Sequence, residues 1–189
     1  MKQIIKKYSD EHIAEILSKG YIGAIARGRA EAGPRALGNR SILADARFLK
    51  SKERINGLIK NRRAFQPLAP ICLEEDFDKY FILPNSKITL DYMLYAVRCR
   101  PSTKNVLPAI VHADETARVQ LVTPSNYPFL FQLLTSYKKV TDIGVLINTS
   151  FNGKGEPIVN TPKDAILTYK NLDLDFLVLN NFFISSKLW

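Results

Sequence analysis

Apolar residues recur every three or four positions in several stretches of the chain, which is the spacing of an amphipathic helix. The first stretch opens at Ser9, a residue that favours a helix N-cap, and stops at Gly20. In the last stretch Pro162 follows Thr161 and would occupy the first helical position. The predicted helices are 9–20, 51–60, 73–81, one that Ser125 caps and that reaches Tyr137, and one that opens at Thr161.

Shorter apolar segments bounded by turn residues are typical of strands. The pattern predicts strands at 21–26, 93–99, 117–122, 144–148 and 176–179. Strands and helices alternate along the chain, with no internal repeat and no low-complexity linker between them. The sequence therefore predicts one α/β or α+β domain that spans residues 1–189.

The composition agrees with a globular domain, because 46% of the 189 residues are hydrophobic and 24% are charged. Collagen, a coiled coil and a long disordered chain are excluded. No apolar run has the length of a transmembrane helix, and Met1–Lys7 lacks the hydrophobic region of a secretory signal. Cys72 and Cys99 lie in apolar or strand-like stretches, which favours buried thiols in a reducing compartment. We therefore expect a cytoplasmic protein that does not bind membranes.

Positive charge is concentrated in one part of the chain. The formal net charge is +9, and the segment 24–66 alone contributes +8, from eleven basic and three acidic residues. Such a focused excess indicates a polyanionic ligand, either the phosphates of a nucleotide or a nucleic-acid backbone. The alternative is a solvated basic face. The high content of Arg, Gly and Pro in the segment argues against that alternative.

The segment Gly28–Ser41 is the first candidate for chemistry, and it directly follows the strand predicted at 21–26. Four arginines, three glycines and one proline lie between Arg27 and Ser41, a composition that suits neither a helix nor a strand. We expect a shaped loop in which glycine lets the backbone approach a ligand and arginine grips phosphate or carboxylate oxygens. The segment lacks the Gly-Lys-Ser/Thr ending of a Walker loop.

Two further segments carry basic or imidazole groups. Lys60 and Arg62 lie where the helix predicted at 51–60 ends, although compensation of the helix dipole is an alternative role for them. Arg118 follows His112 and Asp114, a His-x-Asp pair that is a weak metal signal without a third ligand. A hydrogen bond that orders the loop is the favoured role of that pair.

A polar stretch follows the buried-looking strand at 144–148. The residues 148–152 are Asn-Thr-Ser-Phe-Asn, whose amides and hydroxyls can hold an anion or a ribose without adding charge. Ser150 lacks the flanking glycines of a nucleophile elbow, and the chain has only two histidines to serve as its base. A serine-hydrolase site is therefore disfavoured.

Together these segments resemble the C-terminal domain of the carbamoyltransferase family that includes nodulation protein NodU and the tobramycin and hydroxymethylcephem O-carbamoyltransferases. The resemblance covers about Gly20 to Leu179. It rests on Gly-Arg-x-Glu-x-Gly-Pro-Arg-Ala-Leu-Gly-Asn-Arg-Ser at 28–41, Thr-Ala-Arg-Val-Gln at 116–120, and Asn-Thr-Ser-Phe-Asn at 148–152 followed by Gly-Glu-Pro-Ile at 155–158. The family implies a YrdC-like α/β fold, a twisted mixed sheet with flanking helices and a basic concave face.

The resemblance also implies a reaction. ATP, with Mg²⁺ on its phosphates, and carbamoyl phosphate would be the ligands, and carbamoyl-adenylate would form with release of pyrophosphate. Positioning and charge neutralisation would carry such a step without a side-chain nucleophile. In the family an N-terminal actin-like-fold domain transfers the carbamoyl group to a hydroxyl acceptor. Nothing in this sequence resembles that domain, so we expect it to act in cis or in trans.

The resemblance further implies which residues do this work. The catalytic cations would be Arg118, Lys60 and Arg35, and no protein ligand for a metal is implied. The residues expected to bind substrate or nucleotide are Arg29, Arg40, Ser41, Arg62, Thr116, Asn148, Thr149, Ser150 and Asn152. A nucleotide-binding regulatory module and an RNA-binding YrdC-like module are the alternatives. The segment 24–66 holds only Phe48 and Phe65 as aromatic residues, which makes nucleic acid an unlikely partner.

Overall fold

The computed structural model describes residues 4–83 and 88–187, so residues 1–3, 84–87 and 188–189 of the predicted domain lie outside the described residues. The strands are β1 (Ile4–Lys7), β2 (Gly23–Ala26), β3 (Arg40–Asp45), β4 (Ala69–Leu73), β5 (Phe81–Ile82), β6 (Val97–Cys99), β7 (Thr116–Ala117), β8 (Gln120–Val122), β9 (Val145–Ser150), β10 (Phe176–Leu179) and β11 (Phe182–Ser185). The α-helices are α1 (Asp10–Ser18), α2 (Leu49–Arg54), α3 (Phe77–Tyr80), α4 (Thr103–Val106), α5 (Pro128–Thr141) and α6 (Pro162–Asn171). A π-helical segment, η1 (Ile55–Ile59), continues α2, and a 3₁₀ turn, η2 (Glu74–Asp76), precedes α3.

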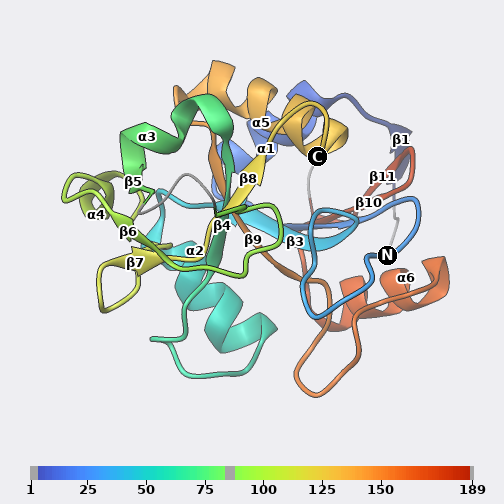
Figure 1. Ribbon diagram of the computed structural model, residues 1–189. Helices are drawn as coiled ribbons and strands as arrows, with labels where there is room; N and C mark the ends of the chain where they lie inside the picture. Colours follow the sequence, from blue (N-terminus) through green and yellow to red (C-terminus); the bar gives the residue numbers. More distant parts are fainter. Residues whose placement is uncertain (1–3, 84–87, 188–189) are drawn as a thin grey trace.

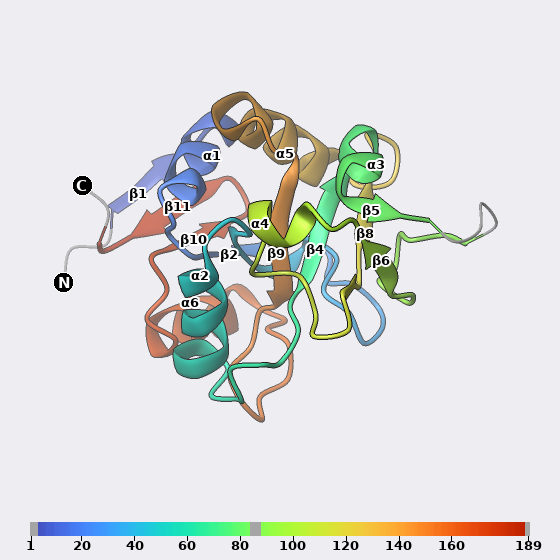
Figure 2. The ribbon, with the colours of Figure 1, turned by 90° about the vertical axis from the view of Figure 1, so that its left-hand side faces the viewer.

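Eight strands form one mixed sheet in the order β1-β11-β10-β2-β3-β9-β4-β8 (Figure 1). The pairs β10–β2 and β4–β8 are parallel, and the other five pairs of this sheet are antiparallel. Strands β5, β6 and β7 form a small antiparallel sheet, which Figure 2 shows beside α3 at one end of the large sheet. The predicted mixed α/β fold with flanking helices is confirmed.

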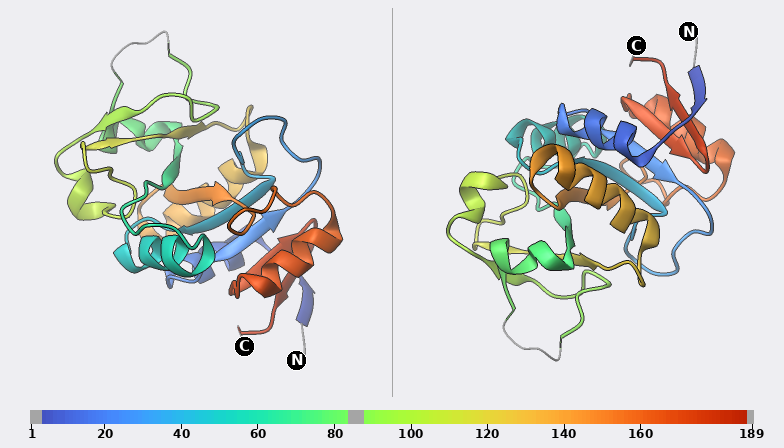
Figure 3. Two further views of the ribbon diagram at one scale, coloured as in Figure 1. Left: turned by 90° about the horizontal axis from the view of Figure 1, so that it is seen from below. Right: turned by 90° about the horizontal axis from the view of Figure 1, so that it is seen from above.

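Helices cover both faces of the large sheet. Figure 3 shows α2 and α6 in front of the sheet in one view, and α1 and α5 in front of it in the opposite view. Alternate residues of a strand enter different cores, so Ile42 packs with the α2–α6 side while its neighbour Leu43 packs with α1 and α5. The central strands are therefore apolar on both faces. No helix in the described part of the chain combines the length and the apolar character that crossing a membrane requires.

The helices predicted at 9–20, at 51–60 and from Thr161 correspond to α1, to α2 with η1, and to α6. Ser9 caps α1 by accepting from the His12 backbone N–H, and Thr161 forms a reciprocal capping box with Asp164 at α6. The prediction that Ser125 caps the next helix is wrong, because α5 begins at Pro128 without a side-chain cap. The helix predicted at 73–81 is shorter than expected. Residue 73 belongs to β4, residues 74–76 form the 3₁₀ turn, and only Phe77–Tyr80 are α-helical.

The strand predictions at 21–26, 144–148 and 176–179 correspond to β2, β9 and β10. The strand predicted at 117–122 is two strands, because Ala117 pairs with Val97 in the small sheet and residues 120–122 pair with β4 in the large one. Only the end of the strand predicted at 93–99 is extended, as β6. Strands β1, β3, β4, β5 and β11 were not predicted.

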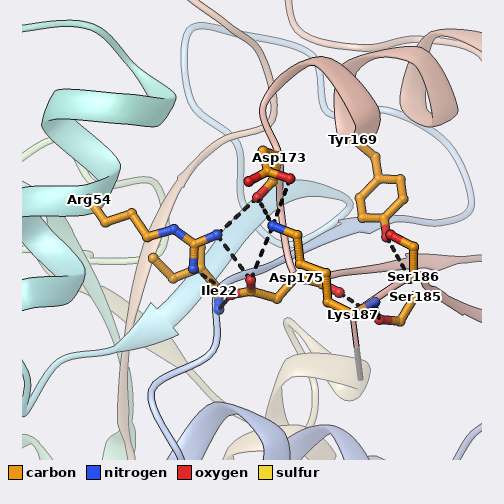
Figure 4. A network of polar contacts seen from close by, with 8 residues as sticks. All are labelled: Ile22, Arg54, Tyr169, Asp173, Asp175, Ser185, Ser186 and Lys187. Carbon is orange, nitrogen blue, oxygen red and sulfur yellow. Dashed lines mark hydrogen bonds and ion pairs between the residues drawn. The ribbon is translucent and has the colours of Figure 1, made fainter. Parts of the chain in front are cut away.

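A polar clasp fixes the C-terminal strand pair against α2 (Figure 4). The Asp175 carboxylate, which is 5% exposed, accepts from Arg54 Nη2 at 3.0 Å and from the Ile22 backbone N–H at 2.8 Å. Lys187 Nζ in turn donates to the Asp173 carbonyl oxygen at 2.7 Å. The clasp thus connects α2, the start of β2 and the turn before β10.

We expect Asp175→Asn to destabilise the fold by roughly 1–3 kcal/mol, because the half-buried guanidinium of Arg54 would lose the buried carboxylate that pairs with it. Asp173→Asn is the matched control, since the Asp173 side chain is 82% exposed and its ion pair with Lys187 should contribute less than about 1 kcal/mol. Urea denaturation of both variants measures the two losses. Equal losses would show that the Arg54–Asp175 pair has no special role.

Candidate functional site

Three sequence motifs meet in one cleft of about 180 Å³ at the edge of the large sheet. Its basic residues come from the loop before β3, the segment after η1 and the junction between β7 and β8. The floor is the end of β9, and Leu68, Ala69 and Met93 form an apolar wall. The predicted site residues that line the cleft are Arg35, Arg62, Arg118, Asn148, Thr149 and Ser150. The structure therefore brings together residues separated by more than 100 positions in the chain.

The loop 28–39 that carries Arg35 is shaped by hydrogen bonds to its backbone. The Glu31 carboxylate accepts from the N–H groups of Leu37 at 2.8 Å and Asn39 at 2.6 Å. Gly38 has φ of +120°, and a Cβ there would lie 2.6 Å from Leu130 Cδ1, so a larger residue does not fit. The predicted shaped loop is confirmed, and glycine serves its conformation and packing.

A pair of buried amides joins this loop to the sheet. Asn148 Nδ2 donates to the Ala36 carbonyl at 3.0 Å and to Gln120 Oε1 at 2.9 Å. Gln120 Nε2 donates to the Leu37 carbonyl at 3.0 Å. Both amide side chains are 2% exposed or less. Gln120, from the motif at 116–120, and Asn148, from the motif at 148–152, thus hold the loop of the motif at 28–41.

Arg35 and Arg118 line the cleft, and no hydrogen-bond or ion-pair partner for them is recorded among the described residues. Neither guanidinium makes a hydrogen bond or an ion pair with a residue of the described chain, and Arg35 Nε is buried without a partner. Asn148 Oδ1, on the floor, is also buried and unpaired. Buried polar groups without partners are costly, so the cleft suits a ligand that carries several negatively charged oxygens and a hydrogen-bond donor.

Arg62 binds the protein with two of its three guanidinium nitrogen atoms. Its Nε donates to Asn56 Oδ1 at 2.8 Å and its Nη2 to the Pro67 carbonyl at 3.3 Å, while no partner for Nη1 is recorded among the described residues. Burial lowers the pKa of Arg62, which nevertheless stays charged at neutral pH. Three guanidinium groups therefore lie around one small cleft.

Lys60 lies beside the cleft but binds the protein. Its ammonium group, 7% exposed, donates to the carbonyl oxygens of Ser150 at 2.6 Å and Asn152 at 2.9 Å and lies within hydrogen-bond distance of Ser150 Oγ and Asn152 Oδ1. Burial and the charge of Arg62 lower the pKa of Lys60 to about 7. Four oxygen partners for three protons leave no donor free, so this geometry suits a residue that shapes the turn after β9.

Two other predicted residues serve the scaffold. Arg40 uses both Nη atoms on the backbone carbonyls of Arg27, Asn39, Gly28 and Asn160, at 2.8 to 3.2 Å. Ser41 is fully buried and accepts from the Gly38 N–H at 2.9 Å. The structure places neither residue in the cleft. The predicted contact between Arg40 and a phosphate would require the guanidinium to give up these carbonyls.

The remaining predicted residues surround the site without lining it. Arg29 is exposed on the loop, and Asn152 is occupied with Lys60 and with the Glu156 carbonyl. Thr116 Oγ1 donates to Asp114 Oδ1 at 2.7 Å and lies 3.1 Å from His112 Nδ1. His112 and Asp114 both contact Thr116, the first residue of β7, which confirms the expected loop-ordering role of the His-x-Asp pair.

The donor set of the cleft does not fit a protein-held Mg²⁺. Its described lining contains no Asp or Glu, and no cluster of three or more His, Cys, Asp or Glu side chains suited to a metal occurs among residues 4–83 and 88–187. The lining offers guanidinium groups, which attract anions. Any Mg²⁺ at this site would have to be held by phosphate oxygens of a ligand.

A larger hollow of about 740 Å³ lies elsewhere, between α2, the end of α1 and Asp175. None of the predicted site residues lines it, and its lining combines the basic residues Lys19, Lys50 and Arg54 with the acidic residues Glu53 and Asp175, the second of which is paired with Arg54. Its size alone therefore does not make it the better candidate for the site.

Sequence reasoning missed the residues that hold the arginines in place. Glu31 and Gln120 lie inside quoted motifs, and Asn56 lies in the predicted basic helix, yet none was assigned a role. A signal was available for Gln120, since an amide in an apolar strand needs a partner. Met93, which contributes to the wall with φ of +54°, carried no signal.

The chain matches the family described as "Carbamoyltransferase C-terminus" over residues 14–186. Nodulation protein NolO of Bradyrhizobium diazoefficiens is 44% identical over 174 residues, which are 92% of this chain and 32% of that protein. The 3'-hydroxymethylcephem-O-carbamoyltransferase of Amycolatopsis lactamdurans is 36% identical over 90% of this chain and 32% of its own length. The chain thus spans about a third of the length of these curated relatives.

Two solved structures of HypF share the fold. Full-length HypF in its phosphate- and nucleotide-bound form superposes with a TM-score of 0.64 at 18% identity, over 95% of this chain and 22% of that one. HypF of T. kodakarensis gives 0.62 at 19% identity, over 95% and 24%. The fold, the three motifs and the match over 14–186 agree, and the chain belongs to the carbamoyltransferase C-terminal family.

Proposed function

We propose that this chain binds carbamoyl phosphate and ATP in the arginine-lined cleft and forms carbamoyl-adenylate with release of pyrophosphate. The carbamoyl group is then transferred to a hydroxyl acceptor by a further domain, in cis or in trans. The name of the Amycolatopsis relative supports the carbamoyl chemistry, and the bound state of HypF supports a nucleotide and a phosphate on this fold.

One observation carries the proposal. Arg35, Arg62 and Arg118 surround a small cleft whose described lining contains no acidic residue. Three positive charges around one small cleft repel one another, and the loss of their hydration adds a further free-energy cost. An anion with several oxygens removes both penalties, because each charge-assisted hydrogen bond contributes about 1.5–3 kcal/mol.

The volume of the cleft limits which part of the ligands it can hold. A drug-sized molecule typically fills roughly 300–1,000 Å³, so about 180 Å³ suits carbamoyl phosphate or the phosphates of a nucleotide. The nucleoside of ATP would lie outside this volume, toward the Ser150 end of β9. The amide and hydroxyl groups there suit a polar sugar.

The proposed chemistry needs no nucleophile from the protein. Water cleaves carbamoyl phosphate to carbamate and phosphate. A carbamate oxygen then attacks the α-phosphorus of ATP, and the bond to the β-phosphate oxygen breaks to release pyrophosphate. Arg35, Arg62 and Arg118 would neutralise charge on the transferring and leaving oxygens, and Lys60 would hold the turn that carries Ser150. Lys60 is thus a positioning residue, whereas Arg35 and Arg118 remain the proposed catalytic cations.

Pyrophosphate release from Mg-ATP, with and without carbamoyl phosphate, tests this proposal. We expect release that depends on carbamoyl phosphate and that falls roughly 10- to 100-fold in Arg118→Ala, since one charge-assisted contact would be lost. Arg100→Ala is the control. It removes the same charge from an exposed residue that is not part of the cleft lining.

Unchanged release in Arg118→Ala would remove this residue from the site. Tight binding of ATP without release of pyrophosphate would instead support a regulatory module, the alternative that has the same ligand but no chemistry. Addition of the transfer domain of a relative distinguishes a module that lacks activity from one whose site that domain completes.

Lys60 gives a prediction for the pH dependence of stability. Its folded-state pKa of about 7 lies below the ordinary value of 10.5, so between these values the unfolded chain binds a proton that the folded chain has released. Stability contributed by this difference therefore rises with pH across that window. From about pH 7 to about pH 10 we expect the wild type to gain roughly 2–4 kcal/mol relative to Lys60→Met. Urea denaturation of both proteins gives the slopes, and parallel slopes would mean that Lys60 stays charged.

A further inference from the structure

Asn56 holds residues 61–67, the segment that carries Arg62, through its side chain. It lies in η1 and is fully buried. Its Nδ2 donates to the carbonyl oxygens of Ala64 and Gln66, both at 2.9 Å, and its Oδ1 accepts from Arg62 Nε at 2.8 Å. Both amide protons and the amide oxygen are thus in use.

The backbone of Asn56 adds a further contact to the same arginine. The Arg62 N–H donates to the Asn56 carbonyl at 2.8 Å, which tightens the turn after η1. The π-helical geometry produces this arrangement, because the Lys60 N–H bonds to the Ile55 carbonyl five residues earlier and leaves the Asn56 carbonyl to Arg62. The side chain and the backbone of one residue therefore fix both ends of the Arg62 segment.

A guanidinium held at Nε has its direction set. The Nε–H points to Asn56 and Nη2 donates to the Pro67 carbonyl at 3.3 Å, so these two contacts fix the plane of a guanidinium that lines the cleft and leave Nη1 for a ligand. An arginine fixed in this way has already lost most of its side-chain freedom before a ligand arrives. Freely rotating arginines would lose that entropy on binding.

We propose that Asn56 is the positioning residue that aims Arg62 at the ligand phosphate and closes the 61–67 segment over the cleft. The inference rests on the proposed function, since it takes Arg62 to bind a phosphate of carbamoyl phosphate or ATP. Asn56 touches no ligand in this role and acts only through Arg62.

A double-mutant cycle tests the dependence on Arg62. The dissociation constants for carbamoyl phosphate and for ATP are measured by calorimetry. We expect Asn56→Ala to weaken binding about ten-fold and to add nothing in the Arg62→Ala background. In the Arg118→Ala background the same change should again weaken binding about ten-fold, because Arg118 does not contact Asn56. Equal effects in both backgrounds would overturn the inference and leave a general structural role.

Val178→Ala controls for lost stability, since Val178 is fully buried in β10 and takes no part in the cleft. It should lower the melting temperature while leaving both dissociation constants within about two-fold. If Asn56→Ala does not fold, the wild type still tests the idea by NMR. The Arg62 Nε–H should exchange with solvent far more slowly than that of Arg98, which is exposed. Equal exchange rates would contradict a fixed Arg62.

The two proposals fail in different ways. A wild type that binds neither carbamoyl phosphate nor ATP overturns the proposed function, and the inference with it. A wild type that binds both, but in which Asn56→Ala weakens binding equally with and without Arg62, overturns the inference alone.

Discussion

The site depends on one buried contact, the pair of amides formed by Asn148 and Gln120. These side chains lie on β9 and β8, on either side of β4, and their free N–H groups hold the carbonyls of Ala36 and Leu37. The β4 residue paired with Asn148 is Ala69, whose short side chain leaves room for the two amides. Because an unsatisfied buried amide is costly, the register of these strands and the path of the Arg35 loop are fixed together.

The arginines of the basic segment divide into two groups by what satisfies them. Arg40 is bound to backbone carbonyls and Arg54 to Asp175, so their charge stabilises the fold. Arg35 and Arg118 have no such partner in the described chain and keep their charge for a ligand. Net charge along a sequence cannot separate these groups, because each arginine's partner comes from a distant part of the chain. The excess of +8 over 24–66 therefore predicts a polyanionic ligand, but it does not show that cations such as Arg40 and Arg54 are already bound by the protein.

The sequence predicted most accurately the elements that are determined by contacts between residues close together in the chain. Capped helices such as α1 and α6 were found, because Ser9 and Thr161 are satisfied within one turn. Strands β3 and β4 were missed, since β3 begins and ends on a charged residue, Arg40 and Asp45, and β4 contains Pro70. The motifs identified which segments line the cleft, but they could not show that Lys60 and Arg40 bind backbone carbonyls from distant parts of the chain. A sequence motif indicates that a residue is required, but only the contacts of that residue in the folded protein indicate what it is required for.

Lys60 binds carbonyl oxygens of the protein, whereas Arg35, Arg62 and Arg118 line the cleft, and this difference follows from the chemistry of the ammonium and guanidinium groups. An ammonium group concentrates its charge and loses its proton readily when buried, and the pKa of Lys60 falls to about 7. Such a group can hold carbonyl oxygens whether or not it is charged, which suits a turn. A guanidinium keeps its charge under the same burial and presents several donors in one plane. In the proposed function, a cleft that binds phosphate oxygens at constant charge would therefore use Arg35, Arg62 and Arg118, while Lys60 holds the carbonyl oxygens of Ser150 and Asn152.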